Sequence, residues 1–282
     1  MSMGYEIRPA KKEEMKIMVE WAAKEGWNPG LHDIDAFYEI DDKGFYLGFL
    51  DNQPISSISA VTYENKFGFL GFYIVKPEFR GLGYGLRLWK EAIKHLPNQN
   101  IGLDGVEDQQ ENYKKSGFKL AYGNVRYEGM GKISEVKNPK IVTISESIFA
   151  DVADYDKDVF PVSRESFLST WFKQPESLAV AYVERGKVSG YGMVRKCING
   201  FKVGPLFADS AKIAEILFQS LRSHVGKGNK VFIDVPEVNK QAVSMMKKYH
   251  LKPIFKTARM YTKELPKVDL NKTFGVTTLE IG

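Results

Sequence analysis

The chain has 282 residues, enough for two domains of ordinary size. Its hydrophobic fraction of 43% and charged fraction of 27% are typical of a globular protein and exclude extensive disorder. The net charge of +5 contains no dense basic run, so it suits a polyanionic small ligand and does not call for nucleic-acid binding. A single cysteine excludes an internal disulfide, and with no membrane-length apolar run or secretory signal a cytoplasmic protein is expected.

The first half alternates short strands and amphipathic helices. Apolar residues at helical spacing predict helices over residues 13–24 and 34–40. The hairpin signature Asp51-Asn52-Gln53-Pro54 joins two strands. The strand at 67–75 is apolar on both faces and is expected deep in a sheet, where Pro77 ends it. The other predicted elements are strands at 5–8, 45–50, 55–63, 101–106 and 118–127 and helices at 86–96 and 109–116.

Residues 129–139 interrupt this pattern with Gly, Ser, Asn and Pro, so the domain boundary is expected there. We therefore predict a first domain at 1–132 and a second at 140–282. The second resembles the first in outline, with strands at 178–183, 188–194, 201–206 and 231–234 and a helix at 211–225.

Two pairs of charged residues recur at matching places in the repeat. Asp234 ends an apolar run as Asp104 does. Arg259 lies eight residues after Leu251, just as Arg126 lies eight after Phe118. The ordered series of matches predicts a tandem repeat of one fold. Residues 273–281 alternate enough to predict a final strand.

The segment Arg80-Gly81-Leu82-Gly83-Tyr84-Gly85 lies between a strand and a helix and predicts a diphosphate site. Glycines allow backbone N–H groups to turn toward one point, and the helix start adds its positive dipole end. Leu86 stands where a dinucleotide-binding loop needs its third glycine, and no Gly-Lys-Ser/Thr is present. From the glycines alone, an ordinary turn before a helix is an equal alternative.

The segment Val75–Gly85 resembles the acetyl-CoA loop of the GCN5-related N-acetyltransferases (GNAT), Gln/Arg-x-x-Gly-x-Gly/Ala after an apolar strand. Asn112–Phe118 resembles the family's Tyr-x-x-x-Gly-Phe segment further along the chain. The resemblance implies an α/β (α+β) fold of two tandem GNAT-type domains, each a mixed, mostly antiparallel central sheet flanked by helices. The second copy is expected to be degenerate and non-catalytic, because it lacks the glycine loop and carries Asp209 there. Its expected role is to supply part of the acceptor pocket or to pack against the first half as a dimer partner would.

The resemblance also implies roles for particular residues. Acetyl-CoA is the expected cosubstrate, with no metal. Tyr113 is the candidate general acid for the departing thiolate, although a packing role is the alternative. Backbone groups of Tyr73, Ile74 and Val75 are expected to bond the pantetheine arm of the cosubstrate. Its pyrophosphate is expected at the amides of Arg80, Gly81, Leu82, Gly83, Tyr84 and Gly85, and Asn112 and Lys115 complete the predicted cosubstrate contacts.

No single motif identifies the general base or the acceptor pocket. Asp104 follows a strand that faces the expected site and is the first candidate for the base, with Glu107, Asp108 and His32 as alternatives. For each carboxylate, a loop or helix-capping role is the competing interpretation. Trp27 and His32 lie in the loop expected to cover the acceptor pocket, where Trp27 either walls the pocket or pins the loop.

Together these features predict an acetyl-CoA-dependent N-acyltransferase that acts on a primary amine, a small molecule ahead of a protein, by direct attack on the thioester. The alternative is a CoA-binding sensor without turnover. Neither a nucleic acid nor a membrane is expected as a partner. The chain is expected to be a monomer with an internal pseudo-dimer or a homodimer.

Overall fold

The computed structural model describes residues 4–132 and 138–282. The helices of the first half are α1 (Met15–Lys24), α2 (Asp33–Ile40), α3 (Tyr84–Ile93) and α4 (Gln110–Lys115). Its strands are β1 (Tyr5–Pro9), β2 (Phe45–Leu50), β3 (Gln53–Tyr63), β4 (Phe67–Val75), β5 (Asn100–Val106) and β6 (Lys119–Met130). The predicted hairpin between β2 and β3 is present, and Asp51 and Asn52 have the positive φ values, 48° and 64°, of a type I′ turn.

The second half repeats this order in outline. Its helices are α5 (Glu146–Asp156), α6 (Glu165–Trp171), α7 (Ala211–Val225) and α8 (Lys240–Lys248). Its strands are β7 (Ile141–Thr143), β8 (Ser177–Glu184), β9 (Lys187–Lys196), β10 (Phe201–Ala208), β11 (Lys230–Pro236), β12 (Lys252–Tyr261) and β13 (Thr273–Gly275). The predicted strand at 273–281 is wrong beyond Gly275, because the chain leaves the sheet there and enters the space between the halves.

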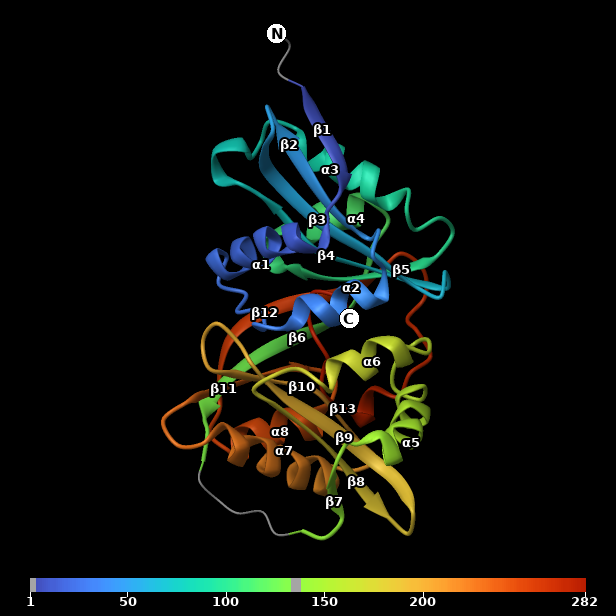
Figure 1. The fold of residues 1–282 in the computed structure, drawn as a ribbon, viewed down its shortest axis with the longest axis vertical. Coiled ribbons are helices and arrows are strands. Elements are labelled where there is room, and N and C mark those ends of the chain that lie inside the picture. The colour runs from blue at the N-terminus through green and yellow to red at the C-terminus, as the bar shows by residue number, and fades with distance from the viewer. Residues whose placement is uncertain (1–3, 133–137) are drawn as a thin grey trace.

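The strands form one continuous mixed sheet through both halves (Figure 1). The strand order is β1-β2-β3-β4-β5-β12-β6-β11-β10-β9-β8-β7, and β13 pairs with β10. Residues 133–137, in the middle of the predicted boundary, lie outside the described residues. The assignment of domains to 1–132 and 140–282 therefore stays a prediction.

The two halves exchange strands at the centre of the sheet. β12, from the second half, pairs antiparallel with β5 of the first half through Thr257–Tyr261. β6, from the first half, pairs antiparallel with β11 of the second half along Met130 to Asn124. Each half therefore completes the sheet of the other, and Figure 1 shows both strands crossing between the lobes. This exchange could not be read from hydrophobic periodicity, which predicts strands but not their partners.

Two buried ion pairs repeat across this exchange. Arg259 of β12 donates from Nε and Nη2 to Asp104 of β5 at 2.9 and 2.6 Å. Arg126 of β6 donates from Nε and Nη2 to Asp234 of β11 at 2.7 and 2.8 Å. These are the four residues whose positions match in the sequence repeat. In each pair the arginine and the aspartate come from different halves. The charged residues that recur in the repeat therefore bind across the two halves, and they do not form a separate ion pair within each half.

The helices next to the exchange close the interface. Phe37 of α2 stacks on Trp171 of α6 with ring centroids 6.0 Å apart and planes 13° apart. Asp33 at the start of α2 pairs with Arg195 of β9 at 2.8 Å, and both side chains are fully buried. These contacts place the loop before α2 firmly against the second half.

Candidate active site

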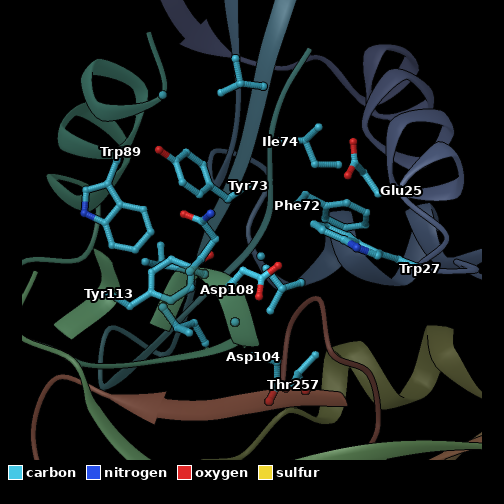
Figure 2. A pocket seen from close by; sticks show the side chains of 18 of the residues that line it. Glu25, Trp27, Phe72, Tyr73, Ile74, Trp89, Asp104, Asp108, Tyr113 and Thr257 are labelled. Atoms are coloured by element: carbon cyan, nitrogen blue, oxygen red, sulfur yellow. The ribbon is translucent and has the colours of Figure 1, made fainter. Parts of the chain in front are cut away.

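A cavity of about 630 Å³ opens where the two halves meet (Figure 2). β4, the loop after it and α3 form one part of its wall, and β5 and β12 form the floor. In Figure 2 aromatic side chains face the space from opposite sides, with Trp89, Tyr73 and Tyr113 on one side and Phe72 and Trp27 on the other.

β4 leaves β5 at the edge of this cavity. The two strands run parallel only as far as the pair Leu70–Leu103. Phe72 has a positive φ of 47°, and the pairing of β4 with β3 shifts register beside it, so β4 bulges here. The separation turns the stretch from Gly71 to Val75 toward the cavity. This stretch contains Tyr73, Ile74 and Val75, the β4 residues predicted to contact the cosubstrate.

The predicted diphosphate loop lies at the mouth of the cavity. Gly81 and Gly83 have φ values of 76° and 83°, which residues with a Cβ rarely adopt. α3 begins at Tyr84, and no side chain in the described part of the chain caps that end. Its first N–H groups and positive dipole end are therefore available to an anion. Gly85 lines the cavity beside them.

Arg80 is held at this mouth by two acceptors. Its Nε donates to the backbone oxygen of Val75 at 2.8 Å, and its Nη2 donates to Glu25 Oε1 at 2.5 Å. The Arg80 side chain is 49% exposed, so the guanidinium faces solvent as well as the loop. A diphosphate bound to the loop would compete with Glu25 for this cation.

Tyr113 lies on α4 with its ring against α3. The ring stacks on Trp89 with centroids 5.7 Å apart and planes 27° apart. Burial raises the pKa of the Tyr113 phenol above its ordinary value. The hydroxyl therefore remains protonated at neutral pH, where it can donate a proton but cannot act as a base.

Asp104 lines the cavity, but its carboxylate is already engaged. Arg259 bonds both oxygens, and Asn124 Nδ2 donates to Oδ1 at 2.8 Å. Burial raises the pKa of Asp104, and the Arg259 guanidinium opposes that rise. A proton on Asp104 would weaken a charge-assisted pair inside the protein. The role of Asp104 as general base therefore stays a prediction, and this geometry disfavours it.

Trp27 lines the cavity, and its loop is held by both halves. Its backbone oxygen accepts from Nη1 of Arg126, on β6 of the first half, at 2.5 Å. Asn28 exchanges two hydrogen bonds with Asn199 of the second half at 2.8 and 2.9 Å. Lining the pocket and pinning the loop, the two roles considered for Trp27 from the sequence, are therefore compatible. His32 precedes α2 and is not among the described residues that line the cavity.

The loop and helix residues predicted to hold the cosubstrate divide into two groups. Arg80, Gly81, Gly83 and Gly85 line the cavity. The described lining does not include Leu82, Tyr84, Asn112 or Lys115.

Four lining residues come from the second half and were not predicted: Phe255, Thr257, Leu279 and Glu280. The first two lie on the exchanged strand β12, and the other two lie in the segment 276–282. The alternation of residues 273–281 indicated an ordered segment, but it carried no signal for the cavity.

The corresponding space in the second half is filled by its own chain. β10 and β11 run parallel as far as Val203–Ile233, and β13 then pairs with β10 at Leu206 and Phe207. Asp209, which stands where the first half has its glycine loop, pairs with Lys272 at 3.0 Å just before β13. Strand β13 thus occupies the position that the cavity has in the first half.

Comparison with known proteins agrees with this geometry. Residues 12–118 match the Acetyltransferase (GNAT) family, and residues 152–275 match an Acetyltransferase (GNAT) domain. The chain is 33% identical over 275 residues to the holothin acyltransferase of Pseudoalteromonas sp. (strain SANK 73390), covering 98% of this chain and 94% of that relative. The chain belongs to the GNAT acetyltransferase family. The predicted family and fold class are confirmed, and this GNAT chain is an acyltransferase.

Other relatives of this GNAT chain extend the comparison. An uncharacterised N-acetyltransferase of Bacillus subtilis (strain 168) is 26% identical over 243 residues, covering 84% of each chain. A putative acetyltransferase from Pyrococcus horikoshii shares the fold with a TM-score of 0.84 and 23% identity, covering 99% of this chain and 96% of the other.

A tandem GNAT protein from the clavulanic acid biosynthesis pathway has a TM-score of 0.63 at 10% identity, covering 92% of this chain and 98% of its own. It therefore shares the fold with this GNAT chain. In the part of the chain that the structure describes, no helix is long and apolar enough to cross a membrane.

Proposed function

We propose that this protein transfers an acetyl group from acetyl-CoA to the primary amine of a small molecule. The observation that carries the proposal is that one cavity brings together the glycine loop, the separated part of β4 and Tyr113. The loop can hold the pyrophosphate, and the extended backbone of β4 can hold the pantetheine arm. The thioester would then lie beside Tyr113.

The backbone of β4 supports the first chemical step. The bulge at Phe72 lies in the stretch from Gly71 to Val75 that lines the cavity. An N–H group aimed at the thioester oxygen would stabilise the oxyanion that forms when the amine attacks. The amine nitrogen forms a bond to the carbonyl carbon, and the carbon–sulfur bond then breaks.

Tyr113 supports the second step. The thiolate that leaves needs a proton, and the protonated phenol of Tyr113 is the hydroxyl we assign to supply it. Stacking on Trp89 limits where the ring can turn. The tyrosine recovers its proton from the nitrogen of the new amide, which must lose one.

The acceptor would enter between the halves. Trp27 and Phe72 from the first half and Phe255 from the second give this part of the cavity apolar, aromatic walls. Such walls suit a small organic amine better than the flexible chain of a protein substrate. The name of the Pseudoalteromonas relative makes holothin the first acceptor to test.

The second half is proposed to support this site without catalysing. β13 occupies the place where a cosubstrate would lie, which supports the prediction of a non-catalytic copy. At the same time β12 and the segment 276–282 supply lining residues to the first half. One site per chain is therefore expected, and titration with acetyl-CoA in a calorimeter should give a stoichiometry near one.

Reversing charge in the loop tests the binding site. A variant with Arg80→Glu and Gly83→Glu should lose measurable acetyl-CoA binding in calorimetry. Two carboxylates would face the pyrophosphate, and replacing Gly83 by any residue with a Cβ would strain the loop at φ 83°. Lys66→Glu is the matched control, since Lys66 is exposed and lies in a distant turn. Equal affinity of the loop variant and the control would remove the loop from cosubstrate binding.

Turnover distinguishes an enzyme from a sensor. We expect steady release of CoA thiol when the protein is given acetyl-CoA and a panel of small amines that includes holothin. Mass spectrometry should find the acetylated amine in equal amount. Tight acetyl-CoA binding with no product from any acceptor would favour the CoA-binding sensor.

A further inference from the structure

Glu280 is a buried carboxylate that lines the cavity, and one of its two oxygens has no hydrogen-bond donor among the described residues. Its side chain belongs to a residue only 3% exposed, and its Oε2 accepts no hydrogen bond from any residue that the structure describes. Two other lining carboxylates are engaged, Asp104 by Arg259 and Glu25 by Arg80. A buried charged oxygen without a donor is costly, so its presence in a cavity indicates a ligand that donates to it.

The segment 276–282 fixes Glu280 in place. Thr278 Oγ1 accepts from the backbone nitrogens of Glu280 and Ile281 at 3.2 and 3.1 Å. Tyr63 of β3 donates from its hydroxyl to the backbone oxygen of Ile281 at 2.9 Å. On the other side of Glu280, the backbone nitrogen of Val276 donates to the backbone oxygen of Asp234 in the second half at 2.9 Å. The segment is therefore anchored to the second half before Glu280 and to the first half after it, and the carboxylate is held in place before any ligand binds.

Glu280 lies where β4 separates from β5. A Cβ on Gly71 would be 2.0 Å from the backbone oxygen of Glu280, so only glycine allows the two chains to meet there. Gly71 directly precedes Phe72, whose bulge turns β4 into the cavity. Gly204 holds the equivalent position in the second half and lies against Thr277 in the same way. The segment thus runs past both points of strand separation.

The surroundings of Glu280 match an ammonium group on an apolar body. An ionised carboxylate attracts an ammonium and accepts its hydrogen bonds. Trp27 and Phe72 line the same cavity and offer faces that also attract a cation. The ring of Phe255 already has the guanidinium of Arg126 over it, 5.6 Å from the centroid. The position beside the β4 bulge places that ammonium near the expected thioester carbon.

We propose that Glu280 binds the ammonium group of the acceptor and removes one of its protons before the attack on the thioester. This inference rests on the proposed function and names the base for the same site. Glu280 takes the proton from R–NH₃⁺, and the free amine forms the C–N bond as the C–S bond breaks. The second nitrogen proton replaces the one that Tyr113 gives to the thiolate. Glu280 then releases its proton to solvent, which balances the reaction.

A competing account makes Glu280 a structural counter-charge. Lys202 of β10 is 1% exposed, and its Nζ makes only a 3.4 Å contact with the backbone oxygen of Trp27. Burial and the nearby Arg126 lower the pKa of Lys202, while Glu280 opposes that shift. The charge of Glu280 also favours the protonated forms of Arg126 and Arg195, so three cations face this carboxylate. Under this account the loss of Glu280 would weaken the fold and slow every step alike. The two accounts differ in their dependence on pH.

Glu280→Gln keeps the size of the side chain and removes the base. With an alkylamine acceptor, we expect kcat/KM at neutral pH to fall by at least about 10²-fold. Wild-type kcat/KM should stay level from neutral pH up to the pKa of the amine, because Glu280 deprotonates the bound ammonium. In the variant only the free amine reacts, and its fraction rises about tenfold per pH unit below the pKa of the amine. The kcat/KM of the variant should rise in the same way, so its deficit relative to wild type should shrink as the pH increases. Acetyl-CoA affinity by calorimetry should stay within about threefold.

The controls separate the possible failures. Glu20→Gln makes the same change on the exposed side of α1 and should leave kcat/KM unaltered. Glu280→Asp retains the charge opposite Lys202, so it should keep the level pH profile at a lower rate even if Glu280→Gln folds poorly. A deficit that is equal at every pH, or one that Lys202→Met restores, would overturn the proposal. A wild-type protein without turnover would instead overturn the proposed function.

Discussion

Replacing Tyr113 by Phe is expected to lower kcat by about 10²–10⁴-fold, the range by which a positioned proton donor accelerates a reaction. The substitution removes one oxygen and leaves the ring that stacks on Trp89, so acetyl-CoA affinity should change little. Burial raises the pKa of Tyr113, so the phenol is protonated over the whole working range. The loss in kcat should therefore be the same at every pH from 6 to about 9.

The measurement is steady-state thiol release at saturating acetyl-CoA, with KM for each substrate determined separately. Tyr38→Phe, which removes a hydroxyl from α2 outside the cavity, is the matched control. A Tyr113→Phe protein with wild-type kcat would show that the residue only packs against α3, the alternative considered from the sequence. A constant loss across pH would also distinguish Tyr113 from Glu280, whose loss should depend on pH.

Breaking the pair between Arg126 and Asp234 is expected to destabilise the protein by about 3–5 kcal/mol, because it leaves a buried charge uncompensated. Both side chains are 2% exposed, and Arg126 bonds Asp234 through two nitrogens. Asp234→Asn should therefore move the urea midpoint strongly. Glu91→Gln, which breaks an exposed pair with Lys94, should cost less than about 1 kcal/mol.

The effect of Asp234→Asn should depend on pH. Burial opposes ionisation of Asp234, but Arg126 overrides it and lowers the pKa below the ordinary value. A lowered pKa in the folded state stabilises the protein above the unfolded pKa of about 3.9, and this stabilisation is lost as pH falls through the folded value. The difference in unfolding free energy between wild type and variant should thus narrow below about pH 4. Equal costs for Asp234→Asn and Glu91→Gln at pH 7 would contradict this account.

The exchange of β6 and β12 makes each half depend on the other for its sheet. In the described structure, β5 pairs with β4 on one side and with β12 on the other. Because β12 comes from the second half, the first half does not complete its own sheet. The second half also holds the loop that contains Trp27, through the two hydrogen bonds between Asn28 and Asn199. Its structural contribution reaches into the cavity itself, so changes far from the glycine loop should alter acceptor use.

Local sequence patterns were sufficient for much of the fold. The predicted strands at 45–50 and 67–75 and the helix at 211–225 have the observed bounds, because alternation and helical periodicity are properties of short segments. The glycine loop was also predicted from a short segment. Glycine adopts positive φ without steric cost, and Gly81 and Gly83 have positive φ in the structure.

The site depended more on contacts between distant residues. The sequence pointed to Tyr113 and Trp27, and the structure places both on one cavity. It also pointed to Asp104 as a base without any sign that Arg259 would engage it. Glu280 received no assignment, because the segment that carries it has no motif.

By itself, the sequence determined the family and the outline of the repeat, and it predicted the cosubstrate loop and the candidate acid. All of these depend on residues close together along the chain. Only the tertiary structure decided which strand pairs with which, that Asp104 and Asp234 bind arginines from the opposite half, and that Glu280 enters the cavity of the first half. The physical reason is that strand pairing and burial depend on packing between segments more than a hundred residues apart.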